Sequence, residues 1–182
     1  MSVASYVTLF RILTIFPIIY FVYFDSILFK LISLLLFTLG ALSDYLDGYI
    51  ARKTDTTSEF GAKFDLVTDK LFVCIILIFI ISLRPDLLLI IPSLIIISRE
   101  FAIIIIRQYF SKKEKNIKTT VSFLGKTKTA FQMVSIGALI LFSSEVGLKY
   151  FIALSLIYIS ALLSLISLFQ YFLSWRRESQ KI

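Results

Sequence analysis

The stretch ILFKLISLLLFTLGALSDYLDGYI, residues 27–50, is apolar for most of its length and then carries Asp44 and Asp47 near its end. A run of this length meets the about 20 residues that an α-helix needs to cross the hydrocarbon core of a membrane. Further apolar stretches of similar length lie on both sides of it, without a soluble linker between them. These stretches are residues 5–24, 60–83, 87–108, 125–143 and 149–174. The pattern predicts an all-α fold, in which a single domain over residues 1–182 forms a bundle of six transmembrane helices.

The composition excludes most soluble folds and every mechanism that depends on imidazole. Of the 182 residues, 58% are hydrophobic and the mean hydropathy is +0.91, whereas soluble domains are roughly 45–50% apolar. The chain contains no histidine, which rules out a Ser-His-Asp triad, a histidine-ligated zinc ion and a histidine base. Its one cysteine, Cys74, allows no intramolecular disulfide and no thiolate metal cluster. Any chemistry must therefore use carboxylates, Lys, Arg or hydroxyl groups.

The basic residues indicate how the helices are oriented. Six crossings place both termini and the polar segments 51–59 and 109–124 on one side of the membrane. Sixteen of the 19 Lys and Arg residues fall on that same side. Lys30, Arg84 and Lys149 fall on the other side, each near an acidic residue. The positive-inside rule then predicts cytoplasmic termini, and a bacterial cytoplasmic membrane is the expected location because no targeting segment is evident. The membrane topology and contact with anionic membrane lipids are enough to explain the net charge of +7. We therefore expect no nucleic-acid partner.

The charges that lie well inside the predicted helices fall in the cytoplasmic half, and five of the six helices carry them. They are Arg11, Asp44, Asp47, Asp65, Asp69, Arg99, Glu100, Lys126 and Lys128. An ionisable group inside a membrane is costly unless it faces a partner or a water-filled cavity. The pattern therefore predicts an active-site cavity that faces the cytoplasm, with a plain apolar bundle on the outer side.

Four aspartates have the spacing of a metal site. Asp44 and Asp47 are three residues apart near the end of one predicted helix, and Asp65 and Asp69 are four residues apart near the start of the next. Each pair thus lies on one helix face, and the short connection makes the two helices antiparallel neighbours. Carboxylates at close range repel one another unless they are protonated or bind cations, and oxygen ligands select hard ions, so we expect Mg²⁺ or Mn²⁺, with room for a pair of ions. The alternative is that these aspartates are isolated polar residues at helix ends.

The same helix faces carry residues that have almost no side chain. Gly48, Ala51 and Gly61 each lie four positions from one of these aspartates, and Arg52 follows directly after Ala51. Open space beside a two-metal carboxylate site, together with an arginine, suits a diphosphate.

The run from Asp44 to Asp69, Asp-x2-Asp-Gly-x2-Ala-Arg-x8-Gly-x3-Asp-x3-Asp, resembles the signature of the CDP-alcohol phosphatidyltransferases, and the six-helix pattern extends the resemblance over nearly the whole chain. The resemblance implies a six-helix membrane bundle, usually a homodimer, with a cytoplasm-facing active site. It implies that Asp44, Asp47 and Asp65 hold two divalent ions on the CDP diphosphate, and that Asp69 helps to coordinate them and acts as general base. It also assigns the CDP-binding residues, which are Gly48, Ala51, Arg52 and Gly61.

Two further segments resemble the branch of this family that makes phosphatidylglycerophosphate from CDP-diacylglycerol and glycerol 3-phosphate. They are Ser98-Arg99-Glu100 and Gly125-Lys126-Thr127-Lys128-Thr129 with Gln132. The second phosphate of this acceptor needs cations, and four basic residues converge at the cytoplasmic end of the predicted cavity. The four are Arg99, Arg107, Lys126 and Lys128. The alternatives are a buried salt bridge for Arg99 and ordinary positive-inside flanking for the two lysines.

The N-terminal segment matches this branch only in part. Thr8 and Arg11 fit a Thr-x-x-Arg pattern, which implies a contact with lipid or nucleotide, but Ala4-Ser5 stands where the branch often has Pro-Asn. Leu66 stands where family members often have proline. Leucine at this position only keeps the helix continuous. The first 11 residues form either a short interfacial helix or the first turns of the first span.

Two classes of function compete. The leading hypothesis is an enzyme that transfers a phosphatidyl group to glycerol 3-phosphate, with phosphatidylglycerol, inositol or serine as alternative acceptors. A divalent-cation transporter could use the same aspartates, but no ionisable residue continues their path to the outer face. An inactive relative is disfavoured because every signature aspartate is present.

Overall fold

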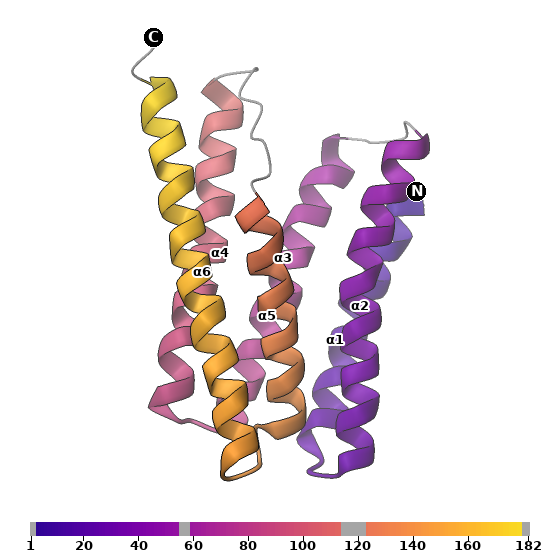
Figure 1. Ribbon diagram of the computed structural model, residues 1–182. Coiled ribbons are helices and arrows are strands. Elements are labelled where there is room, and N and C mark those ends of the chain that lie inside the picture. Colours follow the sequence, from indigo (N-terminus) through magenta and orange to yellow (C-terminus); the bar gives the residue numbers. More distant parts are fainter. Residues whose placement is uncertain (1–2, 55–58, 114–122, 180–182) are drawn as a thin grey trace.

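A computed structural model describes residues 3–54, 59–113 and 123–179, which form six helices and the connections at residues 24–26, 84–86 and 143–147. The helices run alternately up and down, so the start of the first and the end of the last lie toward the same end of the bundle (Figure 1). Their bounds are α1 (Val3–Tyr23), α2 (Ile27–Thr54), α3 (Glu59–Leu83), α4 (Leu87–Lys113), α5 (Phe123–Phe142) and α6 (Leu148–Ser179). The predicted all-α fold and its six helices are confirmed over the described residues.

The helices extend past several of the apolar stretches that predict them. α2 continues to Thr54, α4 to Lys113 and α6 to Ser179, because polar and charged residues favour a helix as well as apolar ones do. α1 is continuous from Val3, so the described part of the N-terminal segment forms the first turns of this helix and is no separate interfacial helix.

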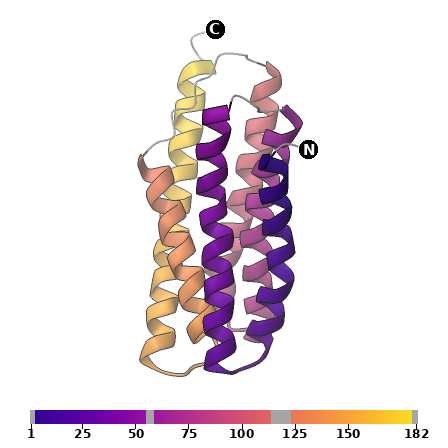
Figure 2. The same cartoon turned by 90° about the vertical axis from the view of Figure 1, so that its right-hand side faces the viewer.

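The six helices enclose one apolar core. α1 packs against α2 and α3, α2 against α5, α5 against α6, and α6 against α4, which also meets α3. Figure 2 shows α2 between α1 and α5. The core contains Ile18, Phe72, Leu77, Leu139 and Ile157, all of which are fully buried. Cys74 on α3 is buried near them, as expected of a small core residue.

The surface of the bundle is more apolar than that of a soluble protein, and each of the six helices exposes large hydrophobic side chains. On α6, Ile159, Leu162 and Leu165 are exposed while Ser160 and Ser164 are buried. Soluble proteins bury the apolar residues of a helix, whereas membrane helices place small residues between helices and apolar residues toward lipid. This arrangement indicates a lipid-facing surface.

Two stretches among the described residues are long and apolar enough to cross a membrane, Leu87–Ile106 and Leu148–Leu173. Three helices contain shorter apolar stretches, which are Leu9–Tyr23, Ile27–Ser43 and Thr127–Phe142. Together with the apolar surface, these stretches indicate an integral membrane protein.

Gly40 allows α2 to approach its neighbours closely. A Cβ atom at this position would lie 2.7 Å from Cζ of Phe72 and 3.4 Å from Oγ1 of Thr14. Phe72 has little freedom to move away, because it is buried and its ring stacks on that of Phe37 with centroids 5.5 Å apart. The close packing of α2 against α1 and α3 therefore depends on glycine here.

We expect Gly40→Ala to lower the stability of the bundle by about 1–3 kcal/mol, because overpacking displaces the ring of Phe72. Thermal unfolding of the purified protein in detergent measures the loss. Thr38→Ala, at an exposed position on the same helix, is the control and should unfold near the wild-type temperature. Equal unfolding temperatures for Gly40→Ala and the wild type would contradict this account of the packing.

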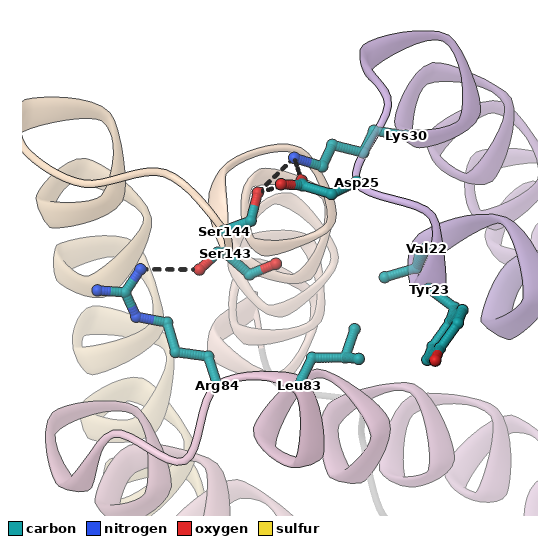
Figure 3. Close-up of a pocket in the computed structure, with 8 residues that line it drawn as sticks. All are labelled: Val22, Tyr23, Asp25, Lys30, Leu83, Arg84, Ser143 and Ser144. Atoms are coloured by element: carbon teal, nitrogen blue, oxygen red, sulfur yellow. Dashed lines mark hydrogen bonds and ion pairs between the residues drawn. The ribbon is translucent and has the colours of Figure 1, made fainter.

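The end of the bundle that carries the α1–α2, α3–α4 and α5–α6 connections is held together by polar contacts around a cavity of about 370 Å³ (Figure 3). We call it the short-loop end. Nζ of Lys30 lies 2.5 Å from Oδ1 of Asp25 and also contacts Ser144, whose hydroxyl donates to Asp25. The cavity is lined by Val22, Tyr23, Asp25, Lys30, Leu83, Arg84, Ser143 and Ser144.

Arg84 makes the second set of contacts at this end. Its guanidinium donates hydrogen bonds of 2.9 Å and 2.7 Å to the carbonyls of Ser143 and Glu145 and lies 3.7 Å from the centre of the Tyr150 ring. The Tyr150 hydroxyl donates in turn to Asp86 at 2.9 Å. These contacts link the α3–α4 connection to the α5–α6 connection and to α6.

The hydrogen bonds from Lys30 and Ser144 hold the pKa of Asp25 below its ordinary value of 3.8. A carboxyl with a lowered pKa stabilises the fold above the unfolded pKa, and this contribution is lost as pH falls through the folded pKa. At neutral pH we expect Asp25→Asn to lower the free energy of unfolding by less than about 1 kcal/mol. The effect is small because Asp25 is exposed. Thermal unfolding from pH 7 to pH 3 should show the difference disappear in acid. A difference that grows below pH 4 would contradict this.

Candidate active site

The aspartate motif lies on two consecutive helices at the end opposite to the short loops, which we call the aspartate end. Asp44 and Asp47 are on α2, and Asp65 and Asp69 are on α3. Both helices are continuous through these residues, which confirms that each pair lies within one helix. The side chains of Asp44, Asp47 and Asp65 are outside the described residues, so the four-carboxylate cluster remains a prediction.

Several other predicted site residues also have side chains outside the described part of the chain, and their roles remain predictions. They are Thr8, Gly48, Ala51, Arg52, Gly61, Arg107 and Lys126. Among the side chains that the structure describes, no group of three or more His, Cys, Asp or Glu residues could hold a metal ion. Asp69 is the one member of the motif whose surroundings can be given.

Asp69 is mostly buried on α3 and is paired with the next residue in the chain. Nζ of Lys70 donates to Oδ2 of Asp69 at 2.6 Å. The same ammonium lies 3.2 Å from Oε2 of Glu100, which is on α4. Lys70 therefore bridges two carboxylates that come from different helices.

Glu100 is the centre of a buried ionic cluster. Its side chain is only 1% exposed and is surrounded by three cations. Oε2 faces Lys70, while Oε1 lies 3.3 Å from Nη1 of Arg99 and accepts a hydrogen bond from Lys128 of α5. A carboxylate buried in an apolar bundle requires such partners, since an unpaired charge there is strongly unfavourable. Counting Asp69 and only the side chains that the structure describes, the cluster has three positive and two negative groups.

The cluster also reaches α6 and includes two of the predicted acceptor-binding cations. Arg99 donates from Nη2 to the hydroxyl of Ser167 at 3.0 Å. The structure brings Arg99 and Lys128 together, and both contact Glu100. For Arg99 this is the buried salt bridge that the sequence leaves open as an alternative. Whether either residue also binds an acceptor phosphate remains a prediction.

Arg11 lies on α1 and is fully buried, and its backbone carbonyl accepts a hydrogen bond of 2.8 Å from the hydroxyl of Thr14. The structure therefore places Arg11 inside the bundle, and its contact with lipid or nucleotide remains a prediction.

The sequence pattern singles out neither Lys70 nor Ser167 and gives Glu100 no central place. In the sequence, Lys70 is one of the sixteen basic residues on the predicted cytoplasmic side. A signal was present, because a lysine that directly follows an aspartate and precedes the apolar run 71–83 needs a buried partner. Ser167 is one of several serines on α6, and nothing in the sequence distinguishes it from the others.

Comparison with known proteins identifies the class of this site. The family model for CDP-alcohol phosphatidyltransferases matches residues 1–171. The chain belongs to this family. The resemblance inferred from the aspartate motif is therefore confirmed, over more than nine-tenths of the chain.

Relatives within the family match nearly the whole length of the chain. It is 36% identical over 179 residues to a protein of Wigglesworthia glossinidia brevipalpis, covering 97% of this chain and 96% of the relative. It is 34% identical to a protein of Haemophilus influenzae, covering 93% and 91% of the two chains, and 35% identical to one of Rickettsia felis, covering 94% and 93%. Each of these relatives is named CDP-diacylglycerol–glycerol-3-phosphate 3-phosphatidyltransferase.

We expect Glu100→Gln to destabilise the bundle by about 3–5 kcal/mol, because it leaves buried cations without their negative partner. The matched control is Glu145→Gln, which removes an ion pair with the exposed Lys149 and should cost less than about 1 kcal/mol. Thermal unfolding in one detergent compares the two. Equal losses would show that the Glu100 cluster contributes no more than a surface pair.

Proposed function

We propose that this chain is an integral membrane enzyme that transfers the phosphatidyl group of CDP-diacylglycerol to glycerol 3-phosphate, giving phosphatidylglycerophosphate and CMP. The observation that carries the proposal is that relatives covering nearly the whole chain at about 35% identity are named for this reaction. The complete aspartate motif and the buried cations at the same end of the bundle support it.

The aspartate motif is proposed to hold Mg²⁺ or Mn²⁺, with two ions as the expected number. Asp44, Asp47, Asp65 and Asp69 would supply the ligands. The donor set fits, because it contains only carboxylate oxygens and hard divalent ions prefer oxygen ligands. When bound, such ions would neutralise the diphosphate and the negative charge that develops on the leaving CMP.

The reaction needs a base for the acceptor hydroxyl. A hydroxyl oxygen of glycerol 3-phosphate attacks the phosphorus that bears the diacylglycerol, a new P–O bond forms, and the P–O bond of the diphosphate breaks to release CMP. The hydroxyl proton is proposed to go to Asp69, the general base that the family resemblance implies. The chain has no histidine, and carboxylates are among the groups that serve this role.

The remaining residues bind the two substrates. Arginine and lysine form charge-assisted hydrogen bonds with phosphate oxygens, so Arg99 and Lys128, together with Arg107 and Lys126, are proposed to hold the phosphate of glycerol 3-phosphate. Contacts with CDP-diacylglycerol are proposed for the signature and N-terminal residues, which are Gly48, Ala51, Arg52, Gly61, Thr8 and Arg11.

We propose a bacterial cytoplasmic membrane as the location, with both termini in the cytoplasm and the aspartate end facing it. The lysines and arginines that support this orientation concentrate beyond that end. A homodimer is proposed as the oligomeric state, and parts of the apolar surface that each helix exposes could form its interface.

Purified protein given CDP-diacylglycerol, Mg²⁺ and glycerol 3-phosphate should release CMP and form phosphatidylglycerophosphate in equal amounts. Mass spectrometry of the lipid and chromatography of the nucleotide measure both. Parallel reactions with phosphatidylglycerol, inositol and serine should form no product, and EDTA should stop the reaction. Product formed only with one of these other alcohols would move the assignment to that acceptor. Metal uptake by vesicles without CMP would favour the transporter.

Asp69→Ala should lower the rate by at least about 10²-fold, the lower range for loss of a general base. Asp25→Ala at the short-loop end is the control, since it removes a carboxylate far from the motif, and it should retain activity. CMP release is measured for both variants at saturating substrate. Full activity of Asp69→Ala would show that the base is a different group.

A further inference from the structure

The contact between Lys70 and Asp69 is not one that helix geometry provides by itself. Consecutive residues on a helix point about 100° apart and do not face each other. Nζ of Lys70 nevertheless lies 2.6 Å from Oδ2 of Asp69. The two opposite charges attract each other, and a further attraction from outside α3 helps to hold the lysine side chain in this position.

Glu100 of α4 provides this attraction. Its Oε2 lies 3.2 Å from the same ammonium, so the lysine is held between two carboxylates. The other oxygen of Glu100 contacts Arg99 and Lys128. Glu100 cannot turn away from Lys70 without weakening these contacts, and it is fully buried, so its position is fixed by α4 and α5.

We propose that Lys70 is a positioning residue for Asp69, which it holds by Oδ2 through an anchor on Glu100. This inference rests on the proposed function, in which Asp69 takes the proton of the acceptor hydroxyl. A catalytic group must be placed within a fraction of an ångström to be effective, and a misplacement of about 1 Å can cost about 10²-fold in rate.

A different role for Lys70 makes a different kinetic prediction. A lysine that bound the acceptor phosphate would act on the affinity for glycerol 3-phosphate, and its loss would raise KM. A lysine that only positions Asp69 acts after the substrate is bound, so its loss lowers kcat and leaves KM for glycerol 3-phosphate unchanged. The two roles are separated by which constant changes.

The test uses the full-length protein in detergent, with CDP-diacylglycerol and the acceptor that the wild type uses. Lys70→Met should lower kcat by about 10- to 100-fold, with KM for the acceptor within about twofold of the wild type. Lys70→Arg keeps a cation between the two carboxylates and should restore most of kcat. Lys149→Met, which removes the lysine of an exposed ion pair, is the matched control and should leave both constants unchanged.

The outcomes are distinct. Unchanged kcat in Lys70→Met, or a raised KM with normal kcat, overturns the proposal, and so does a loss in Lys70→Arg as large as that in Lys70→Met. Thermal unfolding checks that each variant is folded, and Lys70→Gln replaces Lys70→Met under the same criteria if the latter does not fold. Failure of the proposed function would appear separately, as wild-type protein that releases no CMP with any acceptor.

Discussion

A carboxylate buried among apolar helices must be surrounded by positive charge, and Glu100 meets this constraint with Lys70, Arg99 and Lys128. The three partners come from α3, α4 and α5, and Arg99 also binds a serine of α6. One buried residue therefore fixes how four helices sit relative to one another at the aspartate end. Because Lys70 also contacts Asp69, the constraint that stabilises the bundle reaches a residue of the signature motif.

The two ends of the bundle use polar groups in different ways. At the short-loop end, Lys30 and Arg84 are held by an aspartate, a serine and backbone carbonyls, and these contacts join neighbouring connections. At the aspartate end, the described polar groups are buried around Glu100 and join side chains of four helices. This cluster lies at the end proposed for phosphatidyl transfer.

The sequence predicted the helices well because apolar runs such as residues 27–50 leave a membrane-spanning chain few alternatives. It also predicted the family, because the spacing from Asp44 to Asp69 depends only on position along two helices. The pairing of Lys70 with Glu100 could not be predicted in this way. That contact joins residues thirty positions apart on different helices, and the local geometry of α3 argues against the contact between Lys70 and Asp69. The bond between Arg99 and Ser167 is likewise set by how α4 and α6 pack.

The central claim is that a hydroxyl of glycerol 3-phosphate attacks the phosphorus that bears the diacylglycerol. The most direct test uses glycerol 3-phosphate labelled with ¹⁸O in its hydroxyl groups, with wild-type protein, CDP-diacylglycerol and Mg²⁺, and mass spectrometry of both products. The account predicts that phosphatidylglycerophosphate carries the label in the new phosphodiester and that the released CMP carries none. Release of phosphatidic acid, with the label joined to the cytidine-bearing phosphorus, would contradict it.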